Sequence, residues 1–514
     1  MKRQKLISRT FLFFFILLNM SCINDPSFKN KEDYTMFDPS WESLEHYRCP
    51  DWFRDAKFGI FICWNPHAVA AHDDWYARNM YLEGHNTYKY HLENFGHPSE
   101  IGYKDIIEMW RGENFNPDRL VETFKEAGAR YIVPIAVYHD NFDLWNSVHH
   151  EWNSVNHGPG KDIIGMWKDA TRKQGLRFGV TTHLARSWSW FQTSHGADTS
   201  GPYKGIPYDG SNPEYQDLYF ETHGNTTLSY PQDPPDYWPE QWYARIKDLV
   251  DQHQPDLLYF DGGIPFGQTG RKMLAYFYNN NIEKHNGELQ AVMNIKNNTA
   301  RPVGNNRFMT WHGDYREGVA VQDIERGQRS KIGQSPWQTD DSIGPWFWMK
   351  DRNYKSPENI IHQLIDIVSK NGNLLLNVPL KSDGSLDEEA ADLLRKVGKW
   401  MGVNGEGIYG SRPFIHFNGM PAWYPDDDFT NIDKSTAENL RFTTRGDTIF
   451  VFTGDIPEDE VIIRSLNKAI YPEFSSVEML GVDNALQFVQ DDEALKVKMP
   501  DAYPCSYSVC LKIY

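Results

Sequence analysis

Asp261 is the side chain of this sequence with the clearest potential for chemistry, because of where the chain places it. Leu257 to Phe260 form a short apolar run, and the dipeptide Gly262-Gly263 predicts a turn directly after Asp261. Together they predict a buried strand that ends in a carboxylate. In a parallel α/β barrel the reactive groups lie where the strands end. A carboxylate in this position also has a purely structural interpretation, as the cap of the following turn.

Buried strands of the same kind alternate with helical segments between residues 46 and 405. Such alternation is typical of a parallel sheet covered by helices. The number of strands and the length of the region favour a (β/α)8-like barrel with insertions over an open sheet. The predicted strands lie at 57–64, 131–137, 176–182, 257–260, 291–295, 319–324 and 373–378, and the predicted helices at 117–128, 162–175, 240–252 and 357–369.

Residues 406–514 have a different pattern, because helical periodicity stops after Arg412-Pro413. Short runs that alternate between polar and apolar residues follow, and turn residues separate them. This pattern predicts a C-terminal antiparallel β-sandwich. The runs lie at 440–444, 448–453, 460–464, 476–480, 495–499 and 507–513.

Residues 1–21 resemble a bacterial lipoprotein signal peptide. A basic segment from Lys2 to Arg9 precedes an apolar run from Phe11 to Leu18, which is too short to span a bilayer. Cys22 follows, and we expect it to be acylated at the head of a tether over 22–45. Cleavage of an ordinary signal peptide nearby is the alternative. The expected protein is an exported bacterial lipoprotein in the periplasm or on the outer-membrane surface, and it meets the membrane only through this N-terminal lipid anchor.

Composition limits the classes of partner. The net charge is −18, and an acidic protein repels phosphate backbones, so we expect no nucleic-acid partner. Flat rings among the 18 Trp, 27 Tyr and 29 Phe residues suit stacking on sugars, although most belong to the core. The four cysteines after Cys22 do not form the pattern of a disulfide framework, and no Cys/His spacing indicates a zinc site. We expect no metal and no cofactor, and the sequence does not indicate an oligomeric state.

Several motifs resemble those of glycoside hydrolase family 29, the α-L-fucosidases. They occur in family order between residues 50 and 413. The family fold is a barrel followed by a β-sandwich, which the sequence patterns also predict. The motifs are Ser369–Pro379 followed by Asp383-Gly384, Trp400–Pro413, Lys57–Trp64, Asp74-Trp75-Tyr76, His139–Trp145 and Pro336-Trp337.

The resemblance implies a retaining glycoside hydrolase whose substrate is an oligosaccharide or polysaccharide. Such an enzyme uses two carboxyl groups about 5–5.5 Å apart, one as nucleophile and one as acid/base. Asp261 matches the family nucleophile. Glu325 is the expected acid/base, and Asp323 is the second choice. A surface salt bridge between Glu325 and Arg326 or Arg329 is the structural alternative.

The sugar pocket is where this sequence departs from the family. Cys63 and Tyr138 stand where the family has histidines, and Asp74 shortens a usual glutamate. Thr181-Thr182-His183 replaces a family segment whose aromatic rings help to enclose the methyl group of L-fucose. Arg186 follows, and its planar guanidinium suits sulfate or carboxylate. The residues that we expect to contact the sugar are Cys63, Asp74, Trp75, Tyr138, His139, Thr182, His183, Arg186 and Tyr259.

These exchanges bear on the substrate. L-fucose is 6-deoxy-L-galactose, so a roomier and more polar pocket at C6 would admit L-galactose or its 6-sulfate, which are units of red-algal galactans. We therefore expect an exo-acting enzyme that releases terminal α-L-fucose-configured sugars and accepts L-galactose as well as, or instead of, L-fucose. An ordinary α-L-fucosidase is one alternative. A catalytically inactive sugar-binding protein is another, although the retained Asp261 argues against it.

Overall fold

The computed structural model describes residues 36–296, 300–302, 308–310, 313–415 and 439–514. The predicted signal peptide at 1–21, the predicted lipidation site Cys22 and most of the predicted tether lie outside the described residues. Among the described helices, none is both long enough and apolar enough to cross a bilayer.

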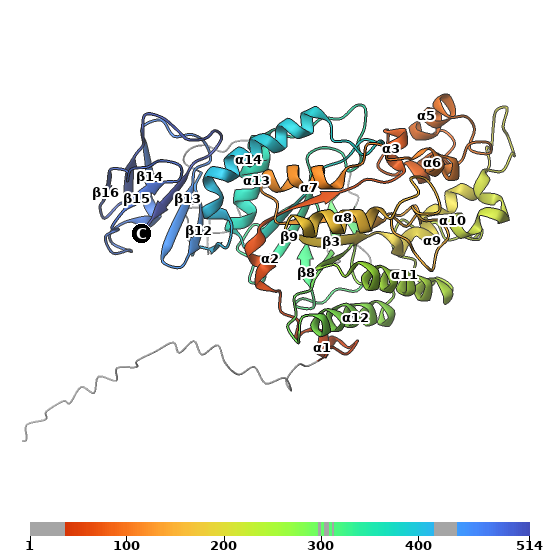
Figure 1. Ribbon diagram of the computed structural model, residues 1–514, viewed down its shortest axis with the longest axis horizontal. Coiled ribbons are helices and arrows are strands. Elements are labelled where there is room, and N and C mark those ends of the chain that lie inside the picture. Colours follow the sequence, from red (N-terminus) through yellow and green to blue (C-terminus); the bar gives the residue numbers. More distant parts are fainter. Residues whose placement is uncertain (1–35, 297–299, 303–307, 311–312, 416–438) are drawn as a thin grey trace, which may run out of the picture. The chain divides into compact units, whose positions relative to one another are not determined.

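Eight parallel strands form a closed barrel, which confirms the predicted (β/α)8-like fold (Figure 1). The first strand pairs with the second and also with the last, so that Phe58 lies opposite Leu374 and the sheet has no free edge. Nearly all residues of the strands are buried, as expected for parallel strands that face the interior on one side and helices on the other. In spatial order the strands are β1 (Phe58–Ile62), β10 (Gly372–Asn377), β9 (Trp337–Ser342), β8 (Val321–Asp323), β5 (Val292–Lys296), β4 (Leu257–Phe260), β3 (Arg177–Thr182) and β2 (Tyr131–Val137).

Strand β9 is the barrel strand that the hydrophobic pattern did not predict. Its sequence runs from Trp337 to Ser342 and is polar after the tryptophan, yet all six residues are buried. The strand is held by its parallel pairing with β10, in which Asp340 lies opposite Leu375. Pairing on both sides therefore overrides a sequence that lacks the apolar run typical of a buried strand.

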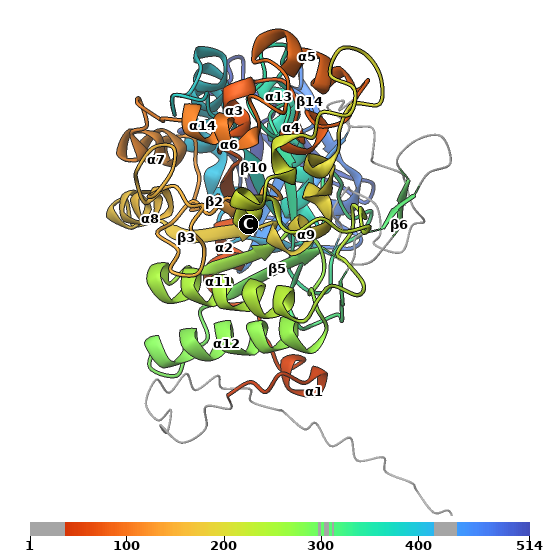
Figure 2. The ribbon, with the colours of Figure 1, turned by 90° about the vertical axis from the view of Figure 1, so that its right-hand side faces the viewer.

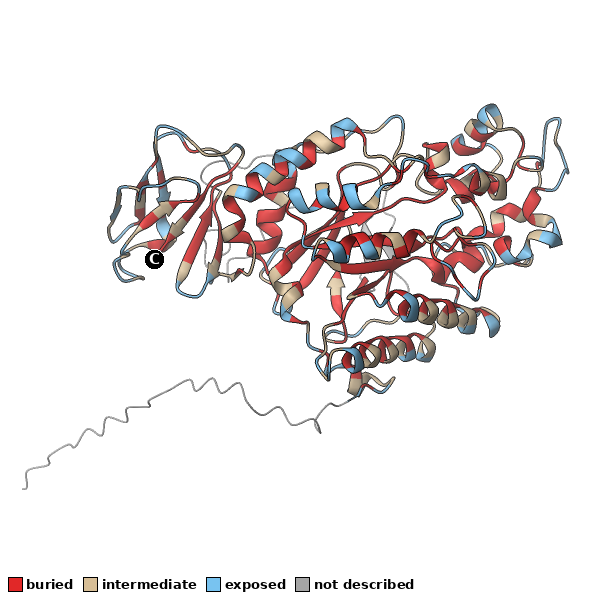
Figure 3. Ribbon diagram, in the orientation of Figure 1, coloured by how far each residue is buried: buried red, intermediate tan, exposed pale blue. Residues whose placement is uncertain are grey.

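Long helices cover the outside of the barrel (Figures 1 and 2). Each presents buried residues to the strands and exposed residues to solvent, as the burial colours in Figure 3 show. Side-chain caps from Asn116, Asp162, Ser356 and Asp387 begin four of them. The helices are α7 (Pro117–Glu126), α8 (Ile163–Lys173), α11 (Tyr237–His253), α12 (Gln268–Lys284), α13 (Pro357–Ser369) and α14 (Glu388–Ile408), and α14 runs across the domain boundary expected after residue 405.

Short elements occupy the segments that precede the barrel or connect its strands. Several of them follow β1 and β3, and they surround the C-terminal ends of these strands, where side chains of the pocket also lie. A two-stranded hairpin of β6 (Ala300–Pro302) and β7 (Phe308–Thr310) follows β5. The others are α1 (Trp41–Leu44), α2 (Asp51–Ala56), α3 (His67–Ala70), α4 (Tyr76–Asn79), α5 (Asn86–Asn94), α6 (Tyr103–Met109), η1 (Leu184–Arg186), α9 (Ser187–Trp190), η2 (Phe191–His195), η3 (Asp209–Ser211), η4 (Pro213–Tyr215) and α10 (Gln216–Tyr219).

Two antiparallel sheets follow the barrel and confirm the predicted C-terminal β-sandwich. Buried side chains of both sheets, such as Val451 and Val497, form one apolar core. Each of the six predicted runs overlaps or contains a strand, and β11 and β16 were not predicted. The five-stranded sheet contains β11 (Arg412–Pro413), β12 (Arg441–Arg445), β13 (Thr448–Phe452), β18 (Cys510–Ile513) and β15 (Val477–Met479); the other contains β14 (Glu460–Ile463), β17 (Leu495–Lys498) and β16 (Phe488–Gln490), and η5 (Arg464–Leu466) follows β14.

Helices α13 and α14 connect the barrel to the five-stranded sheet through buried polar contacts. The Asp366 carboxylate of α13 accepts hydrogen bonds from Lys370 Nζ at 2.7 Å and from Arg441 Nε of β12 at 2.7 Å. Trp400 Nε1 of α14 donates to the Ser508 carbonyl at 2.8 Å. The two parts of the chain therefore share buried charges as well as apolar surface.

The loop after β2 is fixed by a fully buried ion pair. Arg245 of α11 donates to both carboxylate oxygens of Asp143, at 3.1 Å from Nε and 2.6 Å from Nη2, and its Nη1 donates to Asn141 Oδ1 at 2.6 Å. Both side chains of the ion pair are completely inaccessible to solvent. The same loop begins with Tyr138 and His139, so this ion pair anchors the segment that carries them.

Replacing Arg245 by leucine should destabilise the protein by about 3–5 kcal/mol, because it leaves the Asp143 carboxylate buried without a counter-charge. Denaturant unfolding measures the loss. The double variant Arg245→Leu/Asp143→Leu is the control, and it should recover part of the lost stability since no buried charge remains. A single variant as stable as the wild type would show that the ion pair does not hold this loop.

Candidate active site

A glycine turn at the end of β4 delivers Asp261 to the centre of the barrel mouth. Gly262 has φ +147°, which few other residues adopt, and its carbonyl accepts a hydrogen bond from Lys296 N at 2.7 Å. Gly263 has no room for a side chain, because a Cβ atom there would lie 2.8 Å from the Asp314 carbonyl oxygen. The two glycines that predicted the turn are therefore required by its geometry, and they leave Asp261 buried among polar groups.

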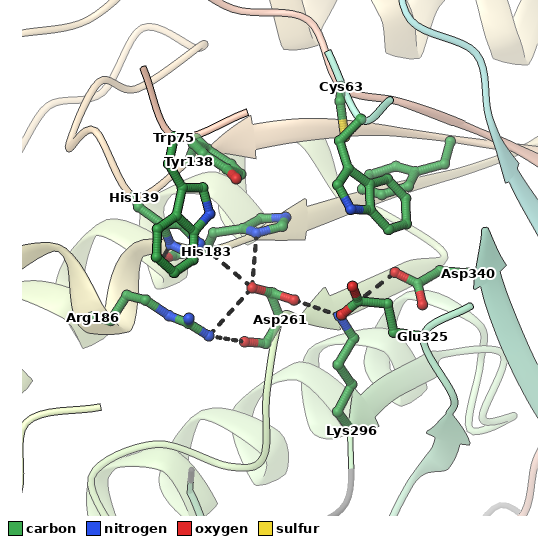
Figure 4. A pocket seen from close by; sticks show the side chains of 12 residues that line it. Cys63, Trp75, Tyr138, His139, His183, Arg186, Asp261, Lys296, Glu325 and Asp340 are labelled. Carbon is green, nitrogen blue, oxygen red and sulfur yellow. Dashed lines mark hydrogen bonds and ion pairs between the residues drawn. The ribbon is translucent and has the colours of Figure 1, made fainter. Parts of the chain in front are cut away.

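The carboxylate of Asp261 is surrounded by positive and polar groups (Figure 4). Its Oδ1 accepts a hydrogen bond from Lys296 Nζ at 2.5 Å. Its Oδ2 lies 3.2 Å from His183 Nδ1 and 3.4 Å from Arg186 Nη2. Burial alone would raise the pKa of Asp261, but the charge of Lys296, His183 and the charge of Arg186 outweigh it and hold that pKa well below its ordinary value. Asp261 is thus an ionised carboxylate at neutral pH.

Lys296 links three carboxylates from neighbouring strands. Besides Asp261, its ammonium group donates to Glu325 Oε2 at 2.9 Å and lies 3.6 Å from Asp340 Oδ2. Burial would lower the pKa of Lys296, but the surrounding carboxylates raise it well above its ordinary value, so the side chain is charged. Because one nitrogen atom touches both Asp261 and Glu325, their contacting oxygens are no farther apart than the sum of those two hydrogen-bond lengths.

These side chains line a cavity of about 480 Å³, part of which is open to solvent. Figure 4 shows Asp261 between two groups of side chains, with His139, His183 and Arg186 on one side and Lys296, Glu325 and Asp340 on the other. The lining residues are Phe61, Cys63, Trp75, Tyr138, His139, His183, Arg186, Asp261, Lys296, Glu325, Asp340 and Trp346.

The hydrogen bonds of His139 fix which of its ring nitrogens carries the proton. Nδ1 lies 2.9 Å from the His183 carbonyl oxygen, which only accepts, so Nδ1 carries the hydrogen. Burial, followed by the charge of Arg186, lowers the pKa of His139 well below its ordinary value, and the ring is neutral. The Nε2 lone pair therefore points toward Asp261 Oδ2, 3.6 Å away. Neither His139 Nε2 nor Asp261 Oδ2 carries a hydrogen to donate to the other. A hydroxyl group of a ligand could therefore donate its hydrogen to one of these two atoms.

His139, His183 and Asp261 are also the one group of described residues whose spacing could hold a metal ion, since one ligand atom of each lies within 4.8 Å of the others. Two cations already contact the same carboxylate, Lys296 at 2.5 Å and Arg186 at 3.4 Å. A divalent ion at this position would be repelled by both. The charges of the site thus favour a neutral ligand with hydroxyl groups.

Most of the residues predicted to bind sugar meet in this cavity. Cys63, Trp75, Tyr138, His139, His183 and Arg186 all line it.

Three predicted binding residues are not among the lining residues. Thr182 follows Thr181, whose Oγ1 lies 3.3 Å from His183 Nε2, and strand alternation directs Thr182 to the opposite face. Asp74 uses Oδ1 to accept a hydrogen bond from Phe347 N at 3.0 Å. Tyr259 lies deeper in the barrel, where its hydroxyl donates to Asp323 Oδ2 at 2.9 Å.

The two candidates for the acid/base differ in their position. Glu325 lines the cavity, with its side chain 17% exposed. Asp323 lies below the cavity, where Gln338 Nε2 also donates to its Oδ1 at 2.8 Å. Burial and then the adjacent charge of Asp340 raise the pKa of Asp323 well above its ordinary value. Of the two carboxyl groups, only Glu325 is placed to reach a bound ligand.

Lys296 and Asp340 were missed from the sequence, together with the aromatic lining residues Phe61 and Trp346. A usable signal existed for Lys296, because it ends a predicted apolar strand on the face where barrel strands carry their functional groups. Asp340 had no such signal, since β9 was not predicted as a strand.

Comparison with known proteins identifies the family. The α-L-fucosidase family model matches residues 26–406, and a model of the α-L-fucosidase C-terminal domain matches residues 433–514. The chain belongs to the α-L-fucosidase family. Its members are glycoside hydrolases, and the fold and the polar cavity of this chain agree with that class of enzyme.

Similar members of the α-L-fucosidase family come from distant organisms. A putative α-L-fucosidase of Caenorhabditis elegans is 29% identical over 409 residues, which cover 76% of this chain and 73% of the relative. The tissue α-L-fucosidase of Homo sapiens is 26% identical over 492 residues, covering 93% and 91%. The crystal structure of a Thermotoga maritima α-fucosidase in complex with fucose has a TM-score of 0.69 at 25% identity, covering 93% of this chain and 100% of that one.

Replacing Lys296 by methionine should move the acid limb of the pH–activity profile to higher pH. A carboxylate with a depressed pKa stays ionised until the pH falls through that low value, so the wild-type site keeps its Asp261 charge in mild acid. Without the Lys296 cation, burial of Asp261 remains and its pKa rises. The profile of kcat/KM against pH for an aryl glycoside measures the shift.

Lys296→Arg is the matched control, because it keeps the cation and should leave the acid limb near its wild-type position. An acid limb that does not move in the methionine variant would show that Lys296 does not set the charge of Asp261.

Proposed function

We propose that this member of the α-L-fucosidase family is a retaining exo-glycosidase in which Asp261 is the nucleophile and Glu325 the acid/base. The observation that carries the proposal is the shared contact of both carboxylates with Lys296. It keeps the two contacting oxygens no farther apart than the sum of those two hydrogen-bond lengths, which supports the roughly 5–5.5 Å spacing of retaining enzymes over the roughly 6.5–9.5 Å spacing of inverting ones.

The proposed reaction has two displacements. An Asp261 oxygen forms a bond to the anomeric carbon as the bond from this carbon to the leaving oxygen breaks, and Glu325 gives its proton to that oxygen. In the second step Glu325 takes a proton from water as the water oxygen displaces Asp261 from the anomeric carbon. The ionised state of Asp261 suits the first step, and the solvent access of Glu325 suits proton exchange with leaving group and water.

The proposed substrate is a glycan with a terminal α-L-fucose-configured sugar. The Thermotoga maritima relative is described in complex with fucose, which supports this configuration. L-galactose has the same configuration with a hydroxyl on C6, and we propose it as a substrate as well as, or instead of, L-fucose. Of the exchanged segment Thr181–His183, His183 is the residue that lines the cavity. An ordinary α-L-fucosidase, as the relatives are named, remains the alternative.

A 6-sulfated L-galactose is the less favoured form of this substrate. Arg186 was the residue expected to bind sulfate, but its Nη2 contacts Asp261 and its Nη1 donates to the Leu228 carbonyl at 3.1 Å. The second cation of the pocket, Lys296, is bound to carboxylates. The proposal therefore gives preference to the unsulfated sugar.

Changing each proposed catalytic carboxyl group should have a different effect. Asp261→Asn should abolish turnover with the fold intact, because an amide cannot form the ester intermediate. Glu325→Ala should slow hydrolysis of a natural glycan by about 10²–10⁴-fold and that of an activated aryl glycoside much less, since only the natural leaving group needs a proton. Azide should accelerate the Glu325 variant on the aryl substrate. Equal loss on both substrates, without azide rescue, would contradict the role of Glu325.

A paired assay tests the substrate. We expect nitrophenyl α-L-galactoside to be hydrolysed with a kcat/KM at least equal to that of nitrophenyl α-L-fucoside by the same preparation. A clear preference for the fucoside would identify an ordinary α-L-fucosidase. Absence of hydrolysis of either glycoside, with binding of the free sugars retained, would point to the inactive binding protein.

Export is a further part of the proposal, and it rests on the sequence of residues 1–22. We expect signal cleavage before Cys22, acylation of Cys22, and a location in the periplasm or on the outer-membrane surface. Metabolic labelling with palmitate should mark the wild type and not a Cys22→Ser variant; label on both would contradict acylation at this residue.

A further inference from the structure

Asp340 is a buried carboxylate in the pocket wall for which the proposed reaction has no use. It lies near the end of β9, its side chain is 3% exposed, and it lines the same cavity as Asp261 and Glu325. Figure 4 shows it on the side of the cavity opposite His139 and Arg186.

The hydrogen bonding of Asp340 is incomplete. Its Oδ1 has no hydrogen-bond partner among the described residues; the other contacts of the carboxylate are a side-chain hydrogen bond shared with Asp323 and the ion pair of Oδ2 with Lys296 Nζ at 3.6 Å. A buried acceptor left without a donor costs about 1–3 kcal/mol, and more when it is charged. A carboxylate offers about four acceptor positions, so it can hold the contact to Lys296 and still accept from a ligand.

The adjacent carboxyl groups Asp341 and Asp323 do not share this deficit. Asp341, the next residue, accepts from Ser342 N at 2.7 Å and from Gln363 Nε2 at 2.7 Å, and it pairs with Lys355. Asp323 accepts from Tyr259 and Gln338, so both of its oxygens have a donor. Of these three carboxyl groups, Asp340 is the one that lines the cavity.

Apart from Lys296 and Glu325, the cavity also has apolar lining residues. Phe61, Cys63 and Trp346 line the cavity, and the rings of Phe61 and Trp346 lie 6.0 Å apart. Burial, followed by the negative charge of Asp74 and that of Asp340, raises the pKa of the Cys63 thiol well above its ordinary value, so Cys63 is an uncharged surface. Aromatic rings together with the unsatisfied Asp340 oxygen fit a CH2–OH group, whose carbon packs on the rings and whose hydroxyl donates to that carboxylate.

The opposite wall suits the ring hydroxyls instead. It presents the His139 Nε2 acceptor and the polar contacts of His183 and Arg186 around Asp261 Oδ2. A pyranose with its anomeric carbon at Asp261 has C2 and its hydroxyl on one side of that carbon, and the ring oxygen with C5 and C6 on the other. With the 2-hydroxyl on the histidine side, C6 lies on the side of Asp340.

We propose that Asp340 is the specificity-determining residue of this site and that its carboxylate accepts a hydrogen bond from the 6-hydroxyl of L-galactose, a group that L-fucose lacks. The inference rests on the proposed function and assigns its substrate preference to one side chain. Hydrogen bonding to the sugar satisfies the carboxylate, whereas a methyl group leaves it unsatisfied. The same negative charge repels a 6-sulfate.

The test is the ratio of kcat/KM for nitrophenyl α-L-galactoside to that for the α-L-fucoside. Asp340→Ala should lower this ratio by about 10- to 100-fold, the effect of losing a hydrogen bond to a charged group. Asp340→Asn should lower it less, because the amide oxygen still accepts. Both variants also alter the contact of residue 340 with Lys296. This change affects kcat/KM for both substrates alike, so it cancels in the ratio.

Asp341→Asn is the matched control, because Asp341 is the adjacent acid on the same strand and its partners lie outside the cavity. It should leave the ratio unchanged. An unchanged ratio in both Asp340 variants overturns the inference, while hydrolysis of either glycoside by the wild type sustains the proposed glycosidase. If the Asp340→Ala variant does not fold, the ratio measured for Asp340→Asn decides whether the inference holds.

Measuring the binding of the free sugars tests the role of Asp340 independently of whether the protein hydrolyses a glycoside. Wild type that hydrolyses neither glycoside overturns the proposed function, and titration with L-galactose and L-fucose then tests Asp340 directly. Selective weakening of L-galactose binding by Asp340→Ala supports the inference; equal weakening of both sugars overturns it.

Discussion

The charge of Lys296 is the interaction on which the site depends. Asp261 is a buried carboxylate whose pKa is held low, and it would be costly to keep ionised without a cation. A single ammonium group, 3% exposed, contacts Asp261, Glu325 and Asp340, which come from the ends of three different strands. Closure of the barrel brings these strand ends together, and the positive charge of Lys296 offsets the repulsion between their carboxyl groups.

This polar cluster continues into the barrel, where side chains are usually apolar. Tyr131 donates to Gln338 Oε1 at 3.2 Å, Gln338 donates to Asp323, and Tyr259 donates to the other oxygen of Asp323. Each group in this chain has a partner, so it holds the layer beneath Asp340 in one arrangement.

The sequence predicted the architecture and the position of Asp261 because both follow from local patterns, an apolar run closed by a glycine turn. It did not predict Asp340, because the sequence of β9 is polar and only pairing with β8 and β10 makes it a strand. The placement of Thr182 depended on which face of β3 it occupies, and alternation from His183 would have assigned it correctly. Contacts between different strands, such as those of Lys296, have no signature in a single sequence.

The contact between Asp366 and Arg441 has a consequence for how the enzyme can be divided. Helix α13 carries Asp366 and leads directly into β10, the strand that closes the barrel against β1. Arg441 of the C-terminal domain thus supplies a counter-charge to Asp366 of α13, the helix that precedes the last barrel strand. Ser508 of the same domain supplies the carbonyl acceptor for Trp400 Nε1. A catalytic fragment that ends after α14 would expose these groups, so the two domains are one cooperative unit rather than an enzyme with a detachable appendage.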